Sequence, residues 1–238
     1  MTHRTRSFVQ AVAVVSTVLG IAVMGVVLGG RRVKADDDNN DQGTNDQKVQ
    51  IGFQIAPVKL NLRGKDRDLV GYGSYIVNAQ ADCNGCHTSD PTMEFTPTGN
   101  PYLLKPVFSG TKQVNPATYL GGGRDFGPFP GPGPFPHIIS RNLTPDKTGL
   151  PEGGHTFSEF VQIIRTGVDM DHLHPTCTGA PDGTCLPPPF DGALLQIMPW
   201  PIYHNMTDHD LRAIYEYLST IPCIAGPPPP DPRHNDCE

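Results

Sequence analysis

The chain has 238 residues, of which 37% are hydrophobic, with 26 glycines, 26 prolines and a formal net charge of −6 at pH 7. This length allows one domain with additions or two small domains. The glycine and proline content predicts a modest core with long irregular loops. The acidic charge balance argues against a nucleic-acid-binding protein, because such proteins need basic patches.

The first 35 residues predict export. Basic residues precede an uncharged, mostly apolar run over residues 8–30, and Val33, Lys34 and Ala35 fit a signal-peptide cleavage site. The apolar run is also long enough to cross a membrane. We therefore expect residues 1–35 to be a signal peptide or an N-terminal membrane anchor. In both cases the remainder is expected to be periplasmic or extracytoplasmic, either soluble after cleavage or anchored through the apolar run.

The rest of the chain divides by composition. Residues 36–57 begin with a polar, acidic stretch and are predicted to be a disordered linker. The domain is expected over residues 58–222. Within it, residues 90–155 lack periodicity and are predicted to be largely a loop insertion, with turn residues throughout 121–137; loops this long are usually functional or wrapped around something. Residues 223–238 are predicted to be a proline-rich C-terminal tail.

The first predicted helix of the domain lies just before a pair of cysteines. Apolar side chains recur at helical spacing from Leu69 to Ala79. This stretch contains Gly71 and Gly73, each of which weakens an isolated helix by about 1 kcal/mol. Glycines are expected there if another backbone packs close to the helix.

Two further helices have clear start signals. Thr156 and Glu159 predict a capping box, and Gly167 is expected to end that helix. Thr207 is the expected N-cap of the last helix, and Pro222 prevents its continuation. The predicted buried stripe of the last helix consists of Leu211, Ile214, Tyr215 and Leu218.

The stretch Cys83-Asn84-Gly85-Cys86-His87 is the main candidate for chemistry. Such a motif can be a redox dithiol, half of a zinc site or the attachment point of a c-type haem. A thioredoxin-type dithiol needs a strand–helix context, whereas this pair follows a predicted helix. A structural zinc site needs two more ligands, and the sequence has no second C-x-x-C. Haem attachment fits best: the cysteines bond to the two vinyl groups, and the histidine binds iron from one face.

The iron of such a haem needs a ligand on its other face. Met93 is too near His87 in the sequence to reach across a haem easily. Met206 directly precedes the last helix and has a structural role, packing on Leu211 as a hydrophobic staple. Met198 lies in a loop before that helix and has no such role. We therefore predict Met198 as the second axial ligand; a thioether favours Fe(II) and raises the reduction potential.

Together these features resemble class I c-type cytochromes, and more closely the cytochrome c domains of membrane-bound alcohol and aldehyde dehydrogenase cytochrome subunits. The similar stretches are GSYIVNAQADCNGCHT, NLTPDKTG, FVQIIRTGV and MPWPIYHNMTDHDLRAIYEYL, spread between residues 71 and 222. The sequence departs from those subunits in having a single CxxCH, because they carry several haem domains in one chain.

The resemblance implies an all-α, class I cytochrome c fold, with three main helices around one covalently bound haem c and the Pro/Gly-rich loop as an insertion. It gives Cys83 and Cys86 the covalent bonds, and His87 and Met198 the axial positions on the iron. It also implies that Gly73 and Tyr75 lie where the first and last helices cross, against Tyr215 or Tyr217.

The function that the resemblance implies is one-electron transfer from a dehydrogenase or quinol-linked donor to another cytochrome, carrier or oxidase. With both axial positions filled, no position stays open for a substrate. We therefore expect an electron-transfer protein, with redox proteins such as a dehydrogenase as partners, rather than an enzyme, and we assign no catalytic residue. A haem enzyme or gas sensor with a labile Met198 is the alternative.

Other residues are weaker candidates for the haem pocket. Arg141 is a candidate partner for a haem propionate, because arginine pairs well with carboxylates; a solvated arginine is the alternative. Trp200 and Tyr203 follow the ligand loop and are expected at the haem edge, where ordinary core packing would give the same contact. His172 and His174 lie among aspartates and could bind a divalent metal, although two histidines in a polar loop are more often solvated.

Four cysteines remain outside the C-x-x-C pair. An exported protein with an even number of them is expected to form disulfides. Three pairings are possible, and we favour Cys177–Cys185 with Cys223–Cys237 because each closes a short local loop. A disulfide of this kind stabilises by about 2–4 kcal/mol, which suits a chain rich in loops.

Overall fold

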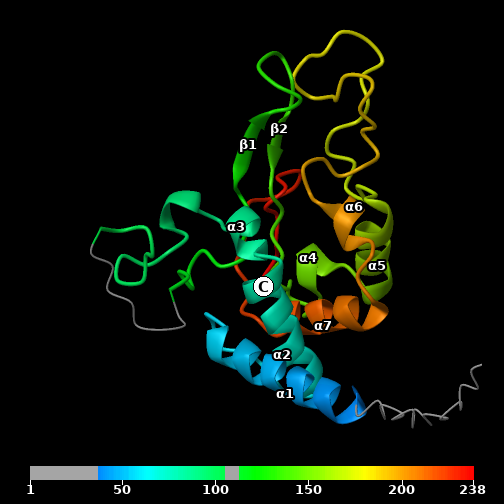
Figure 1. The fold of residues 1–238 in the computed structure, drawn as a ribbon. Helices are drawn as coiled ribbons and strands as arrows, with labels where there is room; N and C mark the ends of the chain where they lie inside the picture. The colour runs from blue at the N-terminus through cyan, green and yellow to red at the C-terminus, as the bar shows by residue number, and fades with distance from the viewer. Residues whose placement is uncertain (1–36, 105–112) are drawn as a thin grey trace, which may run out of the picture. The chain divides into compact units, whose positions relative to one another are not determined.

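The computed structural model describes residues 37–104 and 113–238. The predicted signal peptide or anchor, with its apolar run over residues 8–30, lies outside the described residues. None of the described helices has the length and apolar character needed to cross a bilayer. In chain order the elements are α1 (Asp37–Ile55), α2 (Arg67–Tyr75), the π-helical turn η1 (Ile76–Gln80), α3 (Cys83–His87), the 3-10 turn η2 (Pro91–Met93), β1 (Asp125–Pro128), β2 (His137–Ile139), α4 (Pro151–Gly154), α5 (Phe157–Thr166), α6 (Trp200–Tyr203) and α7 (Asp208–Leu218) (Figure 1).

The described part of the chain is mainly helical, as the sequence predicts, and the predicted helix starts are present. Thr156 and Glu159 make both hydrogen bonds of a capping box at the start of α5, and Gly167 ends that helix with a φ of 72°. Thr207 caps α7 in the same way, with Asp210 as its partner. All four residues of the predicted stripe of α7 are buried.

Helices α2 and α7 cross at a glycine. A Cβ atom on Gly73 would overlap with the carbonyl oxygen of Ala213 and would lie 2.9 Å from the Cβ of Tyr217. Only glycine therefore permits this approach of the two backbones. The crossing implied by the sequence resemblance is present, and Tyr217 is the tyrosine at the contact.

Helix α1 differs from the sequence prediction, which made residues 36–57 a disordered linker and began the domain at Val58. A Cβ on Gly52 would overlap with the carbonyl oxygen of Gly71 in α2, and the hydroxyl of Ser74 donates to the carbonyl of Gly52 at 2.7 Å. The contact between α1 and α2 depends on two glycines and on a hydrogen bond from a serine hydroxyl to a backbone carbonyl. Such a helix cannot be recognised from composition, because its packing needs few apolar side chains.

Buried polar groups connect the insertion to the helix pair. The hydroxyl of Tyr119 donates to Oδ1 of Asn78 at 2.5 Å and lies 2.8 Å from the hydroxyl of Tyr217. Both tyrosines are almost fully buried, at 1% and 0% exposure. Each buried hydroxyl therefore has a partner, as a stable core requires.

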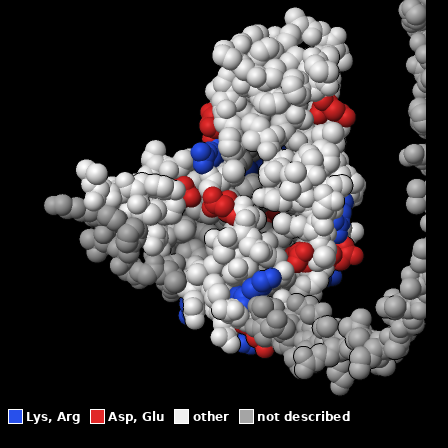
Figure 2. Space-filling view, viewed as in Figure 1, with Lys and Arg blue, Asp and Glu red and all other residues white. Residues whose placement is uncertain are grey.

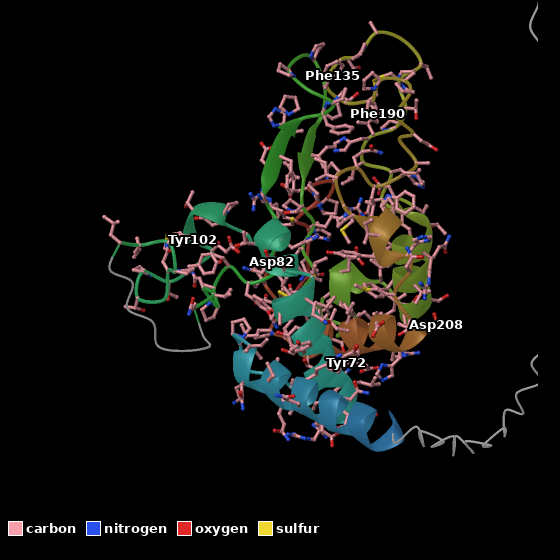
Figure 3. All side chains as sticks on the ribbon, viewed as in Figure 1. Tyr72, Asp82, Tyr102, Phe135, Phe190 and Asp208 are labelled. Atoms are coloured by element: carbon pink, nitrogen blue, oxygen red, sulfur yellow. A yellow bond between two sulfur atoms is a disulfide. The ribbon has the colours of Figure 1, made fainter. Side chains whose placement is uncertain are left out.

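The predicted loop insertion contains a hairpin rather than loop alone. Strands β1 and β2 pair antiparallel, with Asp125 opposite Ile139 (Figure 1). The hairpin packs on the segment 172–190: the rings of Phe129 and Phe190 lie 4.8 Å apart, and Gly183 donates its N–H to the carbonyl of Pro134 at 2.9 Å. We call residues 125–139 and 172–190 the hairpin lobe; Phe135 and Phe190 mark its two segments in Figure 3. Most of its surface on the face shown in Figure 2 carries no charged side chain.

Both disulfides favoured from the sequence are present. Cys177 and Cys185, with Cα atoms 5.0 Å apart, close a loop within the hairpin lobe. Cys223 and Cys237, with Cα atoms 5.8 Å apart, hold the C-terminal segment. That segment is folded back rather than extended: Asn235 is only 3% exposed and donates from Nδ2 to the hydroxyl of Thr144 at 2.9 Å.

The packing of α1 gives a first prediction. Gly52→Ala should lower the free energy of unfolding by about 1–3 kcal/mol, because the new methyl group meets the backbone of α2. In a disordered or unpacked segment, the same change would be neutral or slightly favourable to helix formation. Urea unfolding curves of the variant and the wild type measure the difference.

Gly131→Ala is the matched control, because a Cβ there meets nothing within 4 Å. It should stay within about 0.5 kcal/mol of the wild type. Equal stability of the two variants would contradict the packing of α1 on α2.

Candidate functional site

Helix α3 presents the CxxCH residues from a single helical turn. It follows η1, and π-helical turns occur frequently at functional sites. Asp82 has a left-handed backbone with a φ of 48°, so the chain changes direction directly before Cys83. A Cβ on Gly85 would lie 2.6 Å from the Asp82 carboxylate, which would have to move aside. Asp82 is labelled beside α3 in Figure 3.

The His87 ring is fixed by a backbone carbonyl. Its Nδ1 lies 2.8 Å from the carbonyl oxygen of Arg141, an acceptor, so Nδ1 carries the proton and donates. Nε2 then keeps its lone pair. Burial is the main cause that lowers the pKa of His87, so the imidazole is neutral at pH 7. A neutral histidine whose second nitrogen donates to a carbonyl is the usual form of a metal-binding histidine.

The two thiols of α3 are not poised for redox chemistry. Cys83 and Cys86 are not bonded to each other. Burial, as the main cause, raises the pKa of Cys83 to about 12 and also raises that of Cys86. Reactive dithiols need a lowered thiol pKa, because the thiolate is the nucleophile. The raised pKa values of both thiols therefore disfavour the dithiol interpretation.

Cys83, Cys86 and His87 line a large, mostly apolar cavity. The space between its walls, with the open solvent at its mouth included, measures about 1360 Å³. Its apolar walls come from the hairpin lobe, α5, α7 and the segment before α6, and include Phe126, Ile138, Phe160, Ile163, Ile164, Leu186, Leu194, Leu195, Leu211, Ile214 and Leu218.

Met198 lines this cavity, and so does Met206. The sequence assigned Met206 only a packing role, because its place before a helix cap explained it without reference to a cavity. Met93 is 44% exposed and is not among the cavity residues. Tyr203 lines the cavity and donates its hydroxyl to the carbonyl of Ala81 at 3.2 Å.

Trp200 is not among the lining residues. Its ring lies on Gly167 instead, and its indole N–H donates to the carbonyl of Leu195 at 3.2 Å. The structure therefore gives Trp200 a contact with the loop that carries Met198, and its place at the haem edge stays a prediction.

One wall of the cavity is polar. Arg141 lines it, but its guanidinium already pairs with Asp169 at 2.5 Å and Asp171 at 2.6 Å. Glu152 and His174 also line the cavity, and besides burial, which is the main cause, the charge of Arg141 acts on the pKa of each of them. Burial raises the pKa of Glu152, whose backbone has a φ of 54°. The sequence did not predict the pairing of Arg141 with Asp169 and Asp171, since these residues lie far apart in the chain.

The histidines of residues 169–174 do not form a metal site with the aspartates. The structure has no group of three or more His, Cys, Asp or Glu side chains suited to a metal ion within the described residues. His174 faces the cavity, and its Nδ1 is buried without a hydrogen-bond partner in the described part of the chain. Buried polar atoms normally have partners, so this atom is suited to meet a polar group of a bound ligand.

These residues fit haem c. The site combines two protonated thiols one helical turn apart, a neutral imidazole with a free Nε2, thioethers in the same cavity, apolar walls and one polar wall. Haem needs this donor set: cysteines for its vinyl groups, nitrogen and sulfur for its iron and polar groups for its propionates.

The chain is similar to cytochrome subunits of dehydrogenases. The fructose dehydrogenase cytochrome subunit of Gluconobacter japonicus is 26% identical over 168 residues, which cover 70% of this chain and 24% of that protein. The quinone alcohol dehydrogenase cytochrome c subunits of Gluconacetobacter polyoxogenes and Komagataeibacter europaeus are each 28% identical over 154 residues, covering 64% of this chain and 22% of each relative. No protein-family model and no solved structure matches the chain.

The chain spans about a quarter of the length of the curated relatives that it matches. Within that span, the similarity confirms the resemblance to dehydrogenase cytochrome subunits that the sequence motifs indicated.

Proposed function

We propose that this chain is an exported mono-haem c-type cytochrome, which carries single electrons between a dehydrogenase or quinol-linked donor and a downstream carrier or oxidase. The observation that carries the proposal is that Cys83, Cys86 and His87 line the same apolar cavity as Met198. The names of the similar proteins, which are cytochrome subunits of dehydrogenases, support the same class of function.

Each of these side chains has a distinct role. The two cysteines hold the haem by thioether bonds, and His87 presents Nε2 in a fixed orientation because Nδ1 is bound to a carbonyl. Met198 would supply a thioether ligand to the iron. Bound haem contributes a reversible one-electron change at its iron. The apolar walls exclude water, which favours the less charged, reduced state.

The two candidate ligands determine the class of function. If His87 and Met198 both bind the iron of a haem, no position would stay open for a substrate, so the site would suit a carrier rather than an enzyme. The donor we infer is a dehydrogenase, by analogy with the names of the relatives. Export through residues 1–35 would place the carrier outside the cytoplasm.

Covalent attachment gives the second prediction. The double variant Cys83→Ser/Cys86→Ser should lose all haem that stays with the protein after acid–acetone extraction, because no thioether bond can form. The control is Cys177→Ser/Cys185→Ser, which should keep its haem and lose about 2–4 kcal/mol of stability. A wild-type protein without covalent haem would contradict the proposal.

The axial ligand gives the third prediction. Met198→Ala should remove the weak methionine–iron absorption band, lower the midpoint potential and let most of the reduced protein bind carbon monoxide, because the iron has lost its thioether. Met206→Ala is the matched control from the same cavity and should keep all three wild-type properties.

If Met206→Ala loses these three properties while Met198→Ala keeps them, Met206 is the ligand and Met198 is not. Rapid carbon monoxide binding by most of the reduced wild type would instead favour the alternative, a haem enzyme or gas sensor with a labile ligand.

A further inference from the structure

We propose that Trp200, lying on Gly167, is the positioning residue that holds a strained loop in place and thereby keeps Met198 directed at the haem iron. This inference rests on the proposed function, in which Met198 is an axial ligand.

Met198 lies between two very tight turns. Its N–H donates to the carbonyl of Gln196 at 2.7 Å, and the residue between them, Ile197, has a φ of 67°. A hydrogen bond across one residue with positive φ is the rare, strained form of the γ-turn. The carbonyl of Met198 then accepts from the N–H of Trp200 at 2.8 Å, across Pro199 with a φ of −78°. This second turn is the common, relaxed form.

The strain at Ile197 requires an anchor elsewhere. A β-branched residue at positive φ is an outlier that surrounding contacts must enforce. Burial of the Ile197 side chain is not the main contact that enforces this backbone, since the residue is 42% exposed. The enforcing contacts must therefore act on the residues on either side of the turn.

Those contacts form a closed ring of three residues. The carbonyl of Gly167 accepts from the N–H of Leu195 at 2.7 Å, and the carbonyl of Leu195 accepts from the indole of Trp200 at 3.2 Å. The indole ring returns to Gly167, where a Cβ would overlap with it. The ring brackets the loop on both sides of Met198. Gly167 also ends α5, so the loop is attached to a main helix.

Gln196 adds a local brace before the strained turn. Its side-chain amide donates to the carbonyl of Leu194 at 2.7 Å and to that of Asp191 at 3.1 Å. This brace fixes the chain only before Ile197. After Met198, Trp200 is the contact nearest to the strained turn, and the hydroxyl of Tyr203 on the carbonyl of Ala81 holds the chain further on.

The test measures how easily the ferric, haem-loaded protein exchanges Met198 for external imidazole. Trp200→Phe keeps a ring on Gly167 but loses the indole N–H, and should raise the apparent affinity for imidazole about fivefold, as expected for one lost hydrogen bond. The midpoint potential should fall in the same variant. Ile202→Ala, at a 70% exposed position in α6, is the matched control and should behave as the wild type.

Rescue separates positioning from simple destabilisation. Adding Ile197→Gly to Trp200→Phe should restore part of the wild-type resistance to imidazole, because glycine adopts positive φ without strain. A Trp200→Phe protein that unfolds more easily in urea but exchanges imidazole like the wild type overturns the positioning role.

Met198→Ala distinguishes the two levels of the proposal. If it leaves imidazole binding unchanged, the ligand assignment itself fails. If it increases imidazole binding while Trp200→Phe does not, only the positioning role fails.

Discussion

The contact between the backbones of Gly73 and Ala213 determines where the chemical part of the chain lies. No side chain separates α2 from α7 at that point, so the end of α2 lies directly on the surface of α7. Elements η1 and α3 follow the end of α2 along the chain. The hydrogen-bonded tyrosines at 119 and 217 continue the same junction into the insertion. Changes at this crossing would therefore move the CxxCH turn and one wall of the cavity together.

Arg141 joins the two sides of the site. Its carbonyl fixes the His87 ring, while its guanidinium binds Asp169 and Asp171. The N–H of Asp169 in turn donates to the carbonyl of Ala193 at 2.8 Å, close to the loop that carries Met198. One residue thus connects the segment that orients the imidazole with the segment that leads to the thioether. We regard this connection as the reason that its guanidinium is nearly buried, with only 11% of the side chain exposed.

Local signals in the sequence predicted much of the structure. The helix caps at Thr156 and Thr207 involve residues within one turn of each other, as does the CxxCH motif, so composition and spacing are sufficient to find them. The sequence did not predict helix α1, because the packing of this helix depends on Gly52 meeting the backbone of α2. The sequence also did not predict the hairpin lobe or the contact of Trp200 with Gly167, because each of these joins segments that are distant in the sequence.

The spacing of the six cysteines has a consequence for how the chain matures. Cys177 and Cys185 are separated by 8 positions and Cys223 and Cys237 by 14, whereas any bond from α3 to these four would close a far longer loop. Loop-closure entropy grows with the logarithm of length, so the short pairings are favoured by about 2 kcal/mol over such long ones. In an oxidising compartment, these short separations would favour the Cys177–Cys185 and Cys223–Cys237 bonds before folding is complete. Cys83 and Cys86 would then be left free of bonds to these four cysteines.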